Sequence, residues 1–320
     1  MSRDRAMLTY AAKRLGLAVL VVAVVIVVLF LMIYIIPGDP LSVALGPRAN
    51  PVQVEALRQR MGLDQPIYIQ LLRFYGSVLT GNLGNDILSE EPVLRIIMTL
   101  LPDTLFLILG AMSWSILLGI PLGCLSAMYP GSLMDRITAI LSVSVIAVPA
   151  FVVAVYALLV FSIWLRWFPA IGAGDGVLDG LYHLVLPSLA LGLGWVGYIA
   201  RMLRASILEV QGENHVRTAR AFGLSENKVI FDYVLRIAVL PTLTVLGIGI
   251  GQLLSGAVFA EIVFARPGIG KLVYDAILTR NYPIVSGTVL VTTFFFVLVN
   301  VLADLMIAWL DPRVRLGLQR

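Results

Sequence analysis

The composition of this chain excludes an ordinary soluble domain. Of its 320 residues, 59% are hydrophobic and 13% are charged, whereas soluble domains contain roughly 45–50% apolar and about 25% charged residues. The net charge of +4 comes from dispersed cations without an aromatic-interleaved basic strip, so nucleic acid is not an expected partner. The single cysteine, Cys124, rules out a disulfide within the chain.

Six stretches of the sequence contain no Asp, Glu, Lys or Arg and approach or exceed the roughly 20 residues that cross a bilayer as a helix. We therefore predict an all-α membrane protein with six transmembrane helices. The fourth stretch is the shortest, and we expect it to recruit part of Arg201–Ala205, with both arginines reaching the interface. The predicted spans are Leu15–Ile36, Thr104–Met128, Ile137–Leu165, His183–Ala200, Ile237–Ala260 and Asn281–Ala303.

The first apolar run follows four basic residues, as the core of a secretory signal peptide does. The run covers 22 residues, which is longer than a signal core of roughly 7–15 residues, and no small-residue cleavage site follows it. The next residues are Pro37-Gly38-Asp39-Pro40. We therefore predict an N-terminal segment (1–14) and a retained first transmembrane helix (15–36).

The distribution of basic residues predicts the orientation in the membrane. Six spans place both termini and residues 206–232 on one side, which carries fourteen Lys and Arg residues. The other side carries nine, five of them in the long loop before the second span. Because cytoplasmic loops are enriched in Lys and Arg, we expect the N-terminal segment, residues 206–232 and the tail (311–320) to be cytoplasmic.

Residues 37–100 are predicted to form an external loop between the first two helices, with short amphipathic helices of its own. Asn50 and Pro51 are typical of a helix start, and Gly62 follows as its end. Ile67–Val78 is a second amphipathic stretch. Two interpretations remain open, namely a pair of interfacial helices on the bilayer or an extracytoplasmic cap that contacts a partner.

Residues 206–232 form a polar segment between the fourth and fifth spans, within the membrane core predicted over residues 101–310. We expect one helix from Ser206 or Glu209 to Phe222, roughly 18 Å long, with Gly223 in the left-handed conformation at its end. A rigid helix held between two spans is a segment that a cytoplasmic partner can bind and move. The alternative is an ordinary solvated loop.

Two glycine motifs resemble nucleotide-binding sequences, but neither is expected to bind a nucleotide. Gly192-Leu193-Gly194-Trp195-Val196-Gly197 lies in an apolar span instead of following a strand. Small residues there, as at Gly119 and Gly123, are typical of closely packed membrane helices. Gly268-Ile269-Gly270-Lys271 has Leu272 where a phosphate loop has Ser or Thr.

Few ionisable residues lie within the predicted spans, which argues against an ion-coupled secondary transporter. The two histidines and the cysteine are far apart, so neither a metal site nor the catalytic set of a membrane enzyme is expected.

Glu261 and Asp304 lie near span ends. Asp304 follows Asn300 by four residues, so both share a helix face. They form either a structural pair at a helix contact or polar groups of a translocation path.

Motifs along nearly the whole chain resemble one family, the inner-membrane permease subunits of binding-protein-dependent ABC importers, in the peptide/nickel class. The strongest is Val216–Gly223, followed by Leu240-Pro241. The further matches are Pro37-Gly38-Asp39-Pro40, Gly62-Leu63-Asp64-Gln65-Pro66, Gly81-Asn82-Leu83-Gly84, Leu101-Pro102-Asp103-Thr104, Leu118-Gly119-Ile120-Pro121-Leu122-Gly123, Phe264-Ala265-Arg266-Pro267-Gly268-Ile269-Gly270 and Leu310-Asp311-Pro312-Arg313.

The resemblance implies that the polar segment is a coupling loop that docks into the ATPase. The family motif often begins Glu-Ala-Ala, whereas Arg217, Thr218 and Ala219 stand here, and Phe222 and Arg266 replace a commonly basic and a commonly aromatic residue. Two arginines three residues apart can face acidic partner groups, and small residues allow close approach. The expected coupling residues are Glu209, Glu213, His215, Arg217, Thr218, Ala219, Arg220, Ala221, Phe222 and Gly223.

The resemblance also implies the partners and the location. It implies a multi-pass protein of the bacterial inner membrane that works with a second homologous permease subunit, two ATP-binding subunits and an extracytoplasmic substrate-binding protein. The chain itself would hold no cofactor, and ATP and Mg²⁺ would be bound by the partners. The expected solute is a dipeptide or oligopeptide, with a nickel chelate, glutathione or an opine-like or sugar ligand as alternatives.

Overall fold

The structure is a computed structural model that describes residues 3–35, 52, 55, 58–59 and 64–310. Within these residues the secondary structure is helical, without a β-strand. Most of the first amphipathic helix expected in the external loop, from Asn50 to Gly62, lies outside the described residues, as does the tail (311–320). The second expected stretch corresponds to α4 (Ile67–Leu79).

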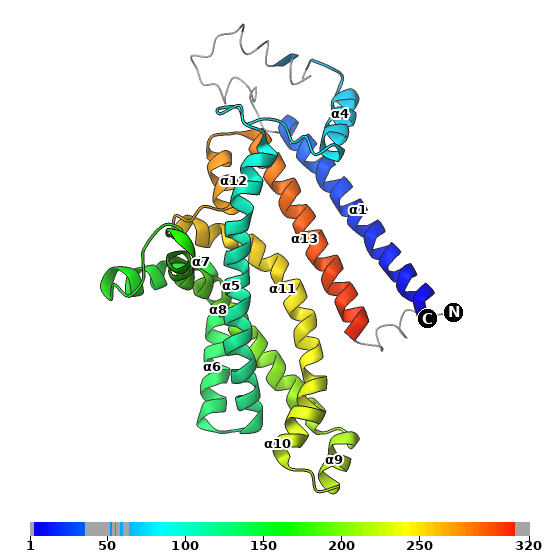
Figure 1. Cartoon of the computed structure of the whole chain (residues 1–320), viewed down its shortest axis with the longest axis vertical. Helices are drawn as coiled ribbons and strands as arrows, with labels where there is room; N and C mark the ends of the chain where they lie inside the picture. Colours follow the sequence, from blue (N-terminus) through cyan, green and yellow to red (C-terminus); the bar gives the residue numbers. More distant parts are fainter. Residues whose placement is uncertain (1–2, 36–51, 53–54, 56–57, 60–63, 311–320) are drawn as a thin grey trace.

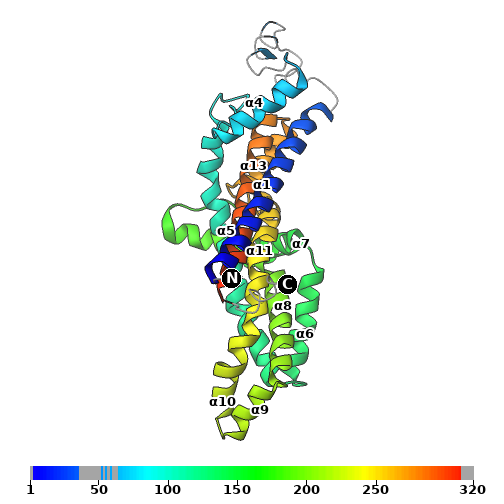
Figure 2. The same cartoon turned by 90° about the vertical axis from the view of Figure 1, so that its right-hand side faces the viewer.

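The described helices form an elongated bundle with a long axis parallel to most of its long helices (Figures 1 and 2). Two segments, η1 and η2, are π-helical. In chain order the elements are α1 (Arg3–Ile35), α4 (Ile67–Leu79), α5 (Val93–Met128), α6 (Leu133–Ala147), α7 (Ala150–Ala157), η1 (Leu158–Trp164), α8 (Gly176–Gln211), α9 (Asn214–Ala221), α10 (Glu226–Lys228), η2 (Val229–Leu235), α11 (Arg236–Val263), α12 (Ile269–Leu278) and α13 (Tyr282–Leu310).

The described part of the chain has five helices long and apolar enough to cross a membrane, and six if one bent pair counts as a span. That pair corrects the third predicted span, Ile137–Leu165. The chain bends by 102° between α6 and the helix that continues from Ala150 to Trp164. Pro149 cannot donate a backbone hydrogen bond, and it drives Val148 into an extended conformation (φ −88°, ψ 124°).

Two other predicted spans were too short because charged residues lie inside the helices. α5 begins at Val93, not at Thr104, and α8 spans Gly176–Gln211, not only His183–Ala200. Each contains 36 residues, or roughly 54 Å of helix, which exceeds the roughly 30 Å hydrocarbon core. The fifth predicted span lies within α11. The helical stretch apolar enough to cross a membrane here is Glu226–Gly247, which begins in α10 and runs through η2 into α11, and the shorter apolar helix Gly249–Val263 follows it.

Glycines bring the central helices α5 and α8 into close contact. A Cβ atom added at Gly192 would lie 2.5 Å from the Ala111 carbonyl oxygen, and one at Gly123 would lie 2.8 Å from that of Ala200. Such distances leave no room for a side chain. The predicted helix-packing role of these glycines is therefore confirmed.

The described ends of the chain lie close together on one side of the bundle (Figure 1). α1 runs beside α13, and an ion pair between Arg14 and Asp304, 2.8 Å long, joins them. At the α4 end of the molecule, Asn281 donates a hydrogen bond to Asp86. Burial acts to raise the pKa of Asp86, but hydrogen bonds from Ser89, Asn281 and the backbone outweigh it and hold that pKa below its ordinary value.

Candidate functional site

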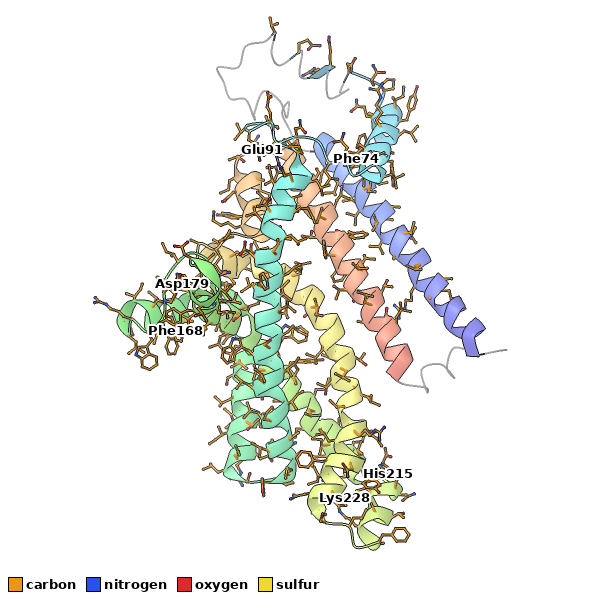
Figure 3. All side chains as sticks on the ribbon, in the orientation of Figure 1. Phe74, Glu91, Phe168, Asp179, His215 and Lys228 are labelled. Atoms are coloured by element: carbon orange, nitrogen blue, oxygen red, sulfur yellow. The ribbon has the colours of Figure 1, made fainter. Side chains whose placement is uncertain are left out.

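The polar segment lies at the end of the molecule opposite α4. Figure 3 shows His215 and Lys228 at this end and Phe74 and Glu91 at the other. The segment contains two helices and not the single helix expected from Ser206 to Phe222. α8 ends at Gln211, and α9 begins at Asn214. Gly212 is unfavourable inside a helix, and Glu213 is extended (φ −73°, ψ 153°), so the chain turns there.

One face of α9 is packed into the protein. Val216 is 0% exposed and Ala219 is 4% exposed. They belong to a hydrophobic cluster that joins α5, α8, α9, η2 and α11. Its other buried members are Ala127, Leu203, Ile207, Val210, Val229, Val234 and Ala238. Ala219 therefore faces this cluster and not a partner, which corrects the expectation that it allows close approach. The contact ties α9 to three long helices.

The opposite face of α9, which we call the α9 outer face, consists of Arg217, Thr218, Ala221 and Phe222. All four residues are exposed, and the Phe222 side chain is 80% exposed. Within the described residues the Arg217 side chain forms no ion pair or hydrogen bond, whereas Thr218 Oγ1 donates to the Asn214 carbonyl oxygen at 2.9 Å. An exposed cation and an exposed aromatic ring at one short helix are side chains that a partner protein can cover.

Gly223 ends α9 as predicted. Its φ is +74°, the left-handed conformation that glycine adopts without steric cost. The Gly223 N–H donates to the Arg220 carbonyl oxygen at 2.9 Å, and the Leu224 N–H donates to that of Ala219 at 3.4 Å. A Cβ atom at Gly223 would meet no heavy atom within 4 Å. The requirement for glycine is therefore one of backbone conformation and not of space.

Arg220, unlike Arg217, forms an ion pair within the chain. Its guanidinium forms an ion pair with Glu226 of α10, at 2.6 Å between Nη2 and Oε1 and 3.2 Å between Nε and Oε2. These bonds raise the pKa of Arg220. The pair closes the turn between α9 and α10. Of the two arginines expected to face a partner, Arg220 is thus exposed but already paired within the chain.

The remaining expected coupling residues lie around the start of α9. The Glu213 carboxylate lies 3.1 Å from His215 Nδ1, so the two side chains bracket the helix start. Glu209 is exposed near the end of α8. Its backbone carbonyl accepts a hydrogen bond from the Gly212 N–H at 3.1 Å. The structure therefore gathers all ten residues around one short helix and its two flanking turns.

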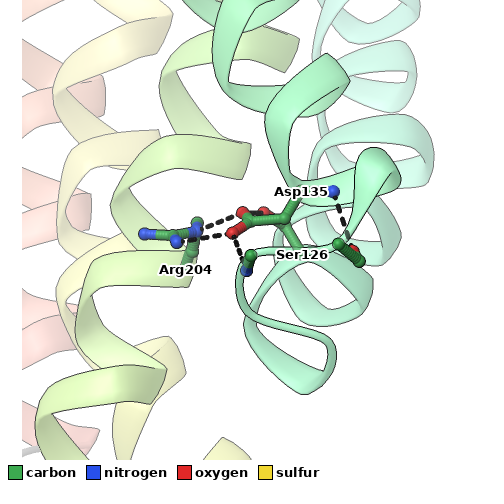
Figure 4. Close-up of polar contacts among 5 residues, drawn as sticks. Ser126, Asp135 and Arg204 are labelled. Atoms are coloured by element: carbon green, nitrogen blue, oxygen red, sulfur yellow. Dashed lines mark hydrogen bonds and ion pairs between the residues drawn. The ribbon is translucent and has the colours of Figure 1, made fainter.

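An ion-pair cluster that sequence analysis missed lies near this site, where α5 turns into α6 (Figure 4). Arg204 of α8 contacts Asp135 through two bonds, Nε to Oδ1 at 2.6 Å and Nη2 to Oδ2 at 2.8 Å. Asp135 also accepts from the Gly131 N–H at 2.8 Å and from Ser126 Oγ. Arg204 therefore contacts a neighbouring helix and does not only reach the interface.

Asp135 could not be paired with Arg204 from the sequence because 69 residues separate them. The available signal was weak. Asp135 is an acidic residue at the N-terminus of α6, where Ser132 Oγ accepts a hydrogen bond from the Asp135 N–H at 3.2 Å and caps the helix. A carboxylate held by a helix start is placed to bind a cation from a neighbour.

The two polar residues noted near the end of the sixth span do not bind each other. Asn300 Nδ2 donates to the Phe296 carbonyl oxygen one turn earlier, at 2.8 Å. Asp304 contacts Arg14 of α1 instead. Of the two expectations, the contact between helices describes Asp304, although its partner is a basic residue of another helix and not Asn300.

Glu261 joins three helices at the far end of α11. Its carboxylate is fully buried, and it accepts hydrogen bonds from Thr104 Oγ1 of α5 at 2.5 Å and from the Lys271 N–H of α12 at 2.9 Å. Thr104 Oγ1 in turn accepts from the Ile269 N–H at 3.0 Å. Side chains from α5 and α11 therefore cap the first turn of α12, because Gly268 before it has no side chain to do so.

This arrangement explains the glycines of the sequence Pro267-Gly268-Ile269-Gly270. A Cβ atom at Gly268 would collide with the Glu261 carboxyl group, and one at Gly270 would lie 2.6 Å from Val258 Cα. The protein's own Glu261 carboxyl group occupies this helix start, so it leaves no room for a phosphate. The same geometry rejects a phosphate loop here. Among the described residues no cluster of His, Cys, Asp and Glu suited to a metal ion occurs.

An all-helical membrane bundle with a short exposed helix at one end is the architecture of an ABC importer permease. The chain belongs to the family described as binding-protein-dependent transport system inner membrane component, which matches residues 119–316. The N-terminal part of such components matches residues 7–108. The chain is thus a membrane-spanning permease subunit of a bacterial ABC importer of the peptide/nickel class.

Two similar permease proteins support this assignment. The chain is 36% identical to the glutathione transport system permease protein GsiC of Escherichia coli (strain K12), over 97% of this chain and 99% of that protein. It is 38% identical to the probable D,D-dipeptide transport system permease protein DdpB of the same strain, over 93% and 95%.

A solved structure shares the fold at low sequence identity. The inward-facing MetNI methionine ABC transporter matches with a TM-score of 0.53 and 17% identity, over 68% of this chain and 97% of that chain. At this identity the likeness concerns the fold alone.

Proposed function

We propose that this chain forms half of the translocation path of an ATP-driven importer of peptide-like solutes, and that α9 receives movement from a cytoplasmic ATP-hydrolysing subunit. The observation that carries the proposal is the two-sided character of α9. Its outer face offers Arg217 and Phe222 to a partner, while Val216 and Ala219 are buried among α5, α8, η2 and α11. A force applied to the α9 outer face therefore acts directly on the membrane helices.

The Asp135–Arg204 cluster extends this connection to the turn between α5 and α6. Arg204 lies one helical turn before Ile207 and Leu208, which contact the α9 cluster. Displacement of α9 would thus move α8, and α8 would carry the α5–α6 turn with it. Nucleotide-driven closure of the partner subunits then has a rigid route to the membrane helices, as alternating access requires.

The proposed assembly contains this chain, a second homologous permease subunit, two ATP-binding subunits that hold ATP and Mg²⁺, and an extracytoplasmic binding protein. Both termini and α9 lie in the cytoplasm, and α4 lies outside. Peptide-like solutes are proposed because the names of two relatives specify glutathione and D,D-dipeptides. Nickel chelates and opine-like or sugar ligands are alternatives within the same class.

We assign Asp304 to the attachment of α1 to α13 and not to the translocation path. Its carboxylate pairs with Arg14 at 2.8 Å, and an ion pair between helices at a membrane boundary serves to fix them. Asn300 stays a candidate path residue, since its side-chain amide reaches only its own helix.

The proposal is tested by reconstitution in proteoliposomes. The purified chain alone should hydrolyse no ATP, whereas the complex with its partner subunits should show ATPase activity and ATP-dependent uptake of labelled dialanine or glutathione. ATPase subunits without the permeases are the control. ATP hydrolysis by the single chain, or a complex that imports without ATP, would contradict the proposed division of labour.

A further inference from the structure

Residues 150–168, which we call the lateral arm, run across the bundle and not along it. α6 is parallel to the long axis of the bundle (Figure 1), and the helix Ala150–Trp164 that follows it is bent away by 102°. α6 contains 15 residues, or roughly 22 Å of helix, which is less than the roughly 30 Å hydrocarbon core. Since α6 starts near the α9 end of the molecule, the lateral arm lies in the leaflet opposite α9, along the membrane plane.

The lateral arm is packed against the bundle on one side and exposed elsewhere. Ala154 is buried in a hydrophobic cluster with Leu186 and Ala190 of α8 and with Phe264. This contact fixes the arm to α8. The exposed large side chains of the arm are Phe151, Val155, Tyr156, Leu159, Ile163, Trp164, Leu165 and Trp167. A rigid apolar element is thus left for a partner outside the described chain to cover.

The far end of the lateral arm is aromatic. Trp164 is 76% exposed and Trp167 is 58% exposed. The Trp167 ring packs against Phe161, with ring centroids 5.8 Å apart, and the Tyr182 hydroxyl donates to the Trp167 carbonyl oxygen. Trp and Tyr are enriched where a membrane meets water, because their rings join an apolar body to a polar edge. These side chains therefore suit the headgroup boundary of a bilayer.

Arg166 lies between the two tryptophans and is the single charged residue from position 137 to position 174. It is exposed, and its side chain forms no hydrogen bond or ion pair within the described residues. Its φ is +54°, a conformation that non-glycine residues rarely adopt and that occurs at binding sites when surrounding contacts hold it. Here the Trp167 N–H donates to the Phe161 carbonyl oxygen at 2.8 Å. A cation held among tryptophans at a membrane boundary attracts lipid phosphate.

We propose that the end of the lateral arm binds a membrane phospholipid, with the Arg166 guanidinium on the phosphate and the rings of Trp164 and Trp167 against the start of the acyl chains. A guanidinium donates two parallel hydrogen bonds to a phosphate. A lipid covers both tryptophans, which a free phosphate would leave uncovered. The bound lipid holds the arm, and α8 through Ala154, at one depth in the membrane. The inference goes beyond the proposed import function and depends neither on the solute nor on the compartment that α9 faces.

The first test measures where the lateral arm lies in the assembled importer. Ile163→Cys, in a Cys124→Ser background, is labelled with a bimane dye in proteoliposomes that contain spin-labelled phosphatidylcholine. A nitroxide near the ester end of the acyl chain should quench the dye about twofold more strongly than one near the methyl end, since an interfacial helix lies at the headgroup boundary. Asn227→Cys, exposed in α10, is the control that neither lipid should quench.

Three results of this test would overturn the proposal. Quenching in the isolated chain but not in the assembled importer would mean that the second permease subunit covers the arm. Stronger quenching by the nitroxide near the methyl end would place the arm in the hydrocarbon core. No quenching in either preparation would place it in water.

The second test measures the contribution of Arg166. The assembled importer, labelled at Ile163→Cys and held in detergent, is titrated with phosphatidylglycerol that carries a nitroxide near the ester end. Arg166→Asn removes the charge and tolerates the positive φ, so the apparent Kd should rise about fivefold, whereas Arg166→Lys should keep most of the affinity. Arg136→Asn is the matched control, because Arg136 is exposed in the first turn of α6. An unchanged Kd in Arg166→Asn would contradict the phosphate contact.

Inorganic phosphate distinguishes a lipid site from a site for a free anion. Millimolar inorganic phosphate should leave the quenching unchanged, because it cannot cover Trp164 and Trp167. If it displaces the lipid, the site binds phosphate itself and the lipid assignment is wrong. The dye reports lipid contact without transport, so an importer that takes up no peptide leaves these measurements decisive.

Discussion

At the scale of single residues, Gly223 is predicted to control the end of α9. Its φ of +74° is strongly disfavoured for β-branched residues. Gly223→Val should therefore cost about 1–2 kcal/mol locally and fray the short helix, while the packed membrane helices stay folded. Recovery of the ATPase subunits in a pull-down and uptake in vesicles should both fall.

The matched control for this change is Gly223→Asn, because asparagine tolerates a positive φ better than other non-glycine residues. It should retain most of the recovery and uptake. Normal coupling in Gly223→Val would mean that the end of α9 does not matter for docking.

Arg217 is predicted to contact the partner directly. Its guanidinium binds no other group in the described part of the chain and is exposed, so its replacement should leave the fold intact. Arg217→Glu should weaken ATPase binding roughly tenfold at low salt, and the difference should shrink at high salt because surface charges are screened. Binding measured at two salt concentrations checks this, with Arg217→Lys as the charge-preserving control. Unchanged binding in Arg217→Glu would remove Arg217 from the contact.

At the scale of elements, the Asp135–Arg204 pair is predicted to hold the α5–α6 turn to α8. Asp135→Asn removes the charge that Arg204 binds through two bonds. The free energy of unfolding should fall, because a partner of the buried hydrogen bonds is weakened, and this should be visible as a lower Tm of the chain in detergent. Uptake should fall while ATPase recovery stays normal, since α9 itself is unchanged.

The exposed neighbour Arg201 offers the control for this element. Arg201→Gln should shift neither the Tm nor the uptake. An Asp135→Asn variant that imports at the normal rate would show that the α5–α6 turn does not need to follow α8.

The places where sequence and structure differ also lie at this scale. Uncharged runs located the membrane helices, but they missed the ends of α5 and α8, because these ends carry charged side chains. Arg204 is paired with Asp135 of α6, whereas Arg95 and Arg201 are exposed. Pro149 breaks a helix, whereas Pro121 and Pro187 lie inside continuous helices. Whether a proline breaks a helix depends on whether neighbouring groups bond the backbone carbonyl that it leaves without a donor. The pattern of apolar residues in the sequence does not report this.

The candidate site likewise has some features that the sequence could predict and others that it could not. The left-handed conformation of Gly223 could be predicted because it follows from local backbone chemistry. The break at Gly212 could have been anticipated on the same ground. The pairing of Arg220 with Glu226, and the inward direction of Ala219, could not be predicted because both depend on how α9 folds back against η2 and α8.

At the scale of the whole molecule, the two ends of the bundle are predicted to face opposite compartments. α4 lies at one end and α10 at the other (Figure 2), and the excess of basic residues is on the α10 side. Cysteines at exposed positions of each end, Tyr68→Cys and Asn227→Cys, can be compared in a Cys124→Ser background. In intact cells, a membrane-impermeant maleimide should label Tyr68→Cys only.

Lysed cells provide the control, because both cysteines should then react at comparable rates. Labelling of Asn227→Cys but not Tyr68→Cys in intact cells would reverse the orientation. α9 would then face away from any source of ATP, and the coupling role of its outer face would fail together with the topology. The orientation of the whole bundle is thus the condition on which the roles of Gly223, Arg217 and Asp135 all depend.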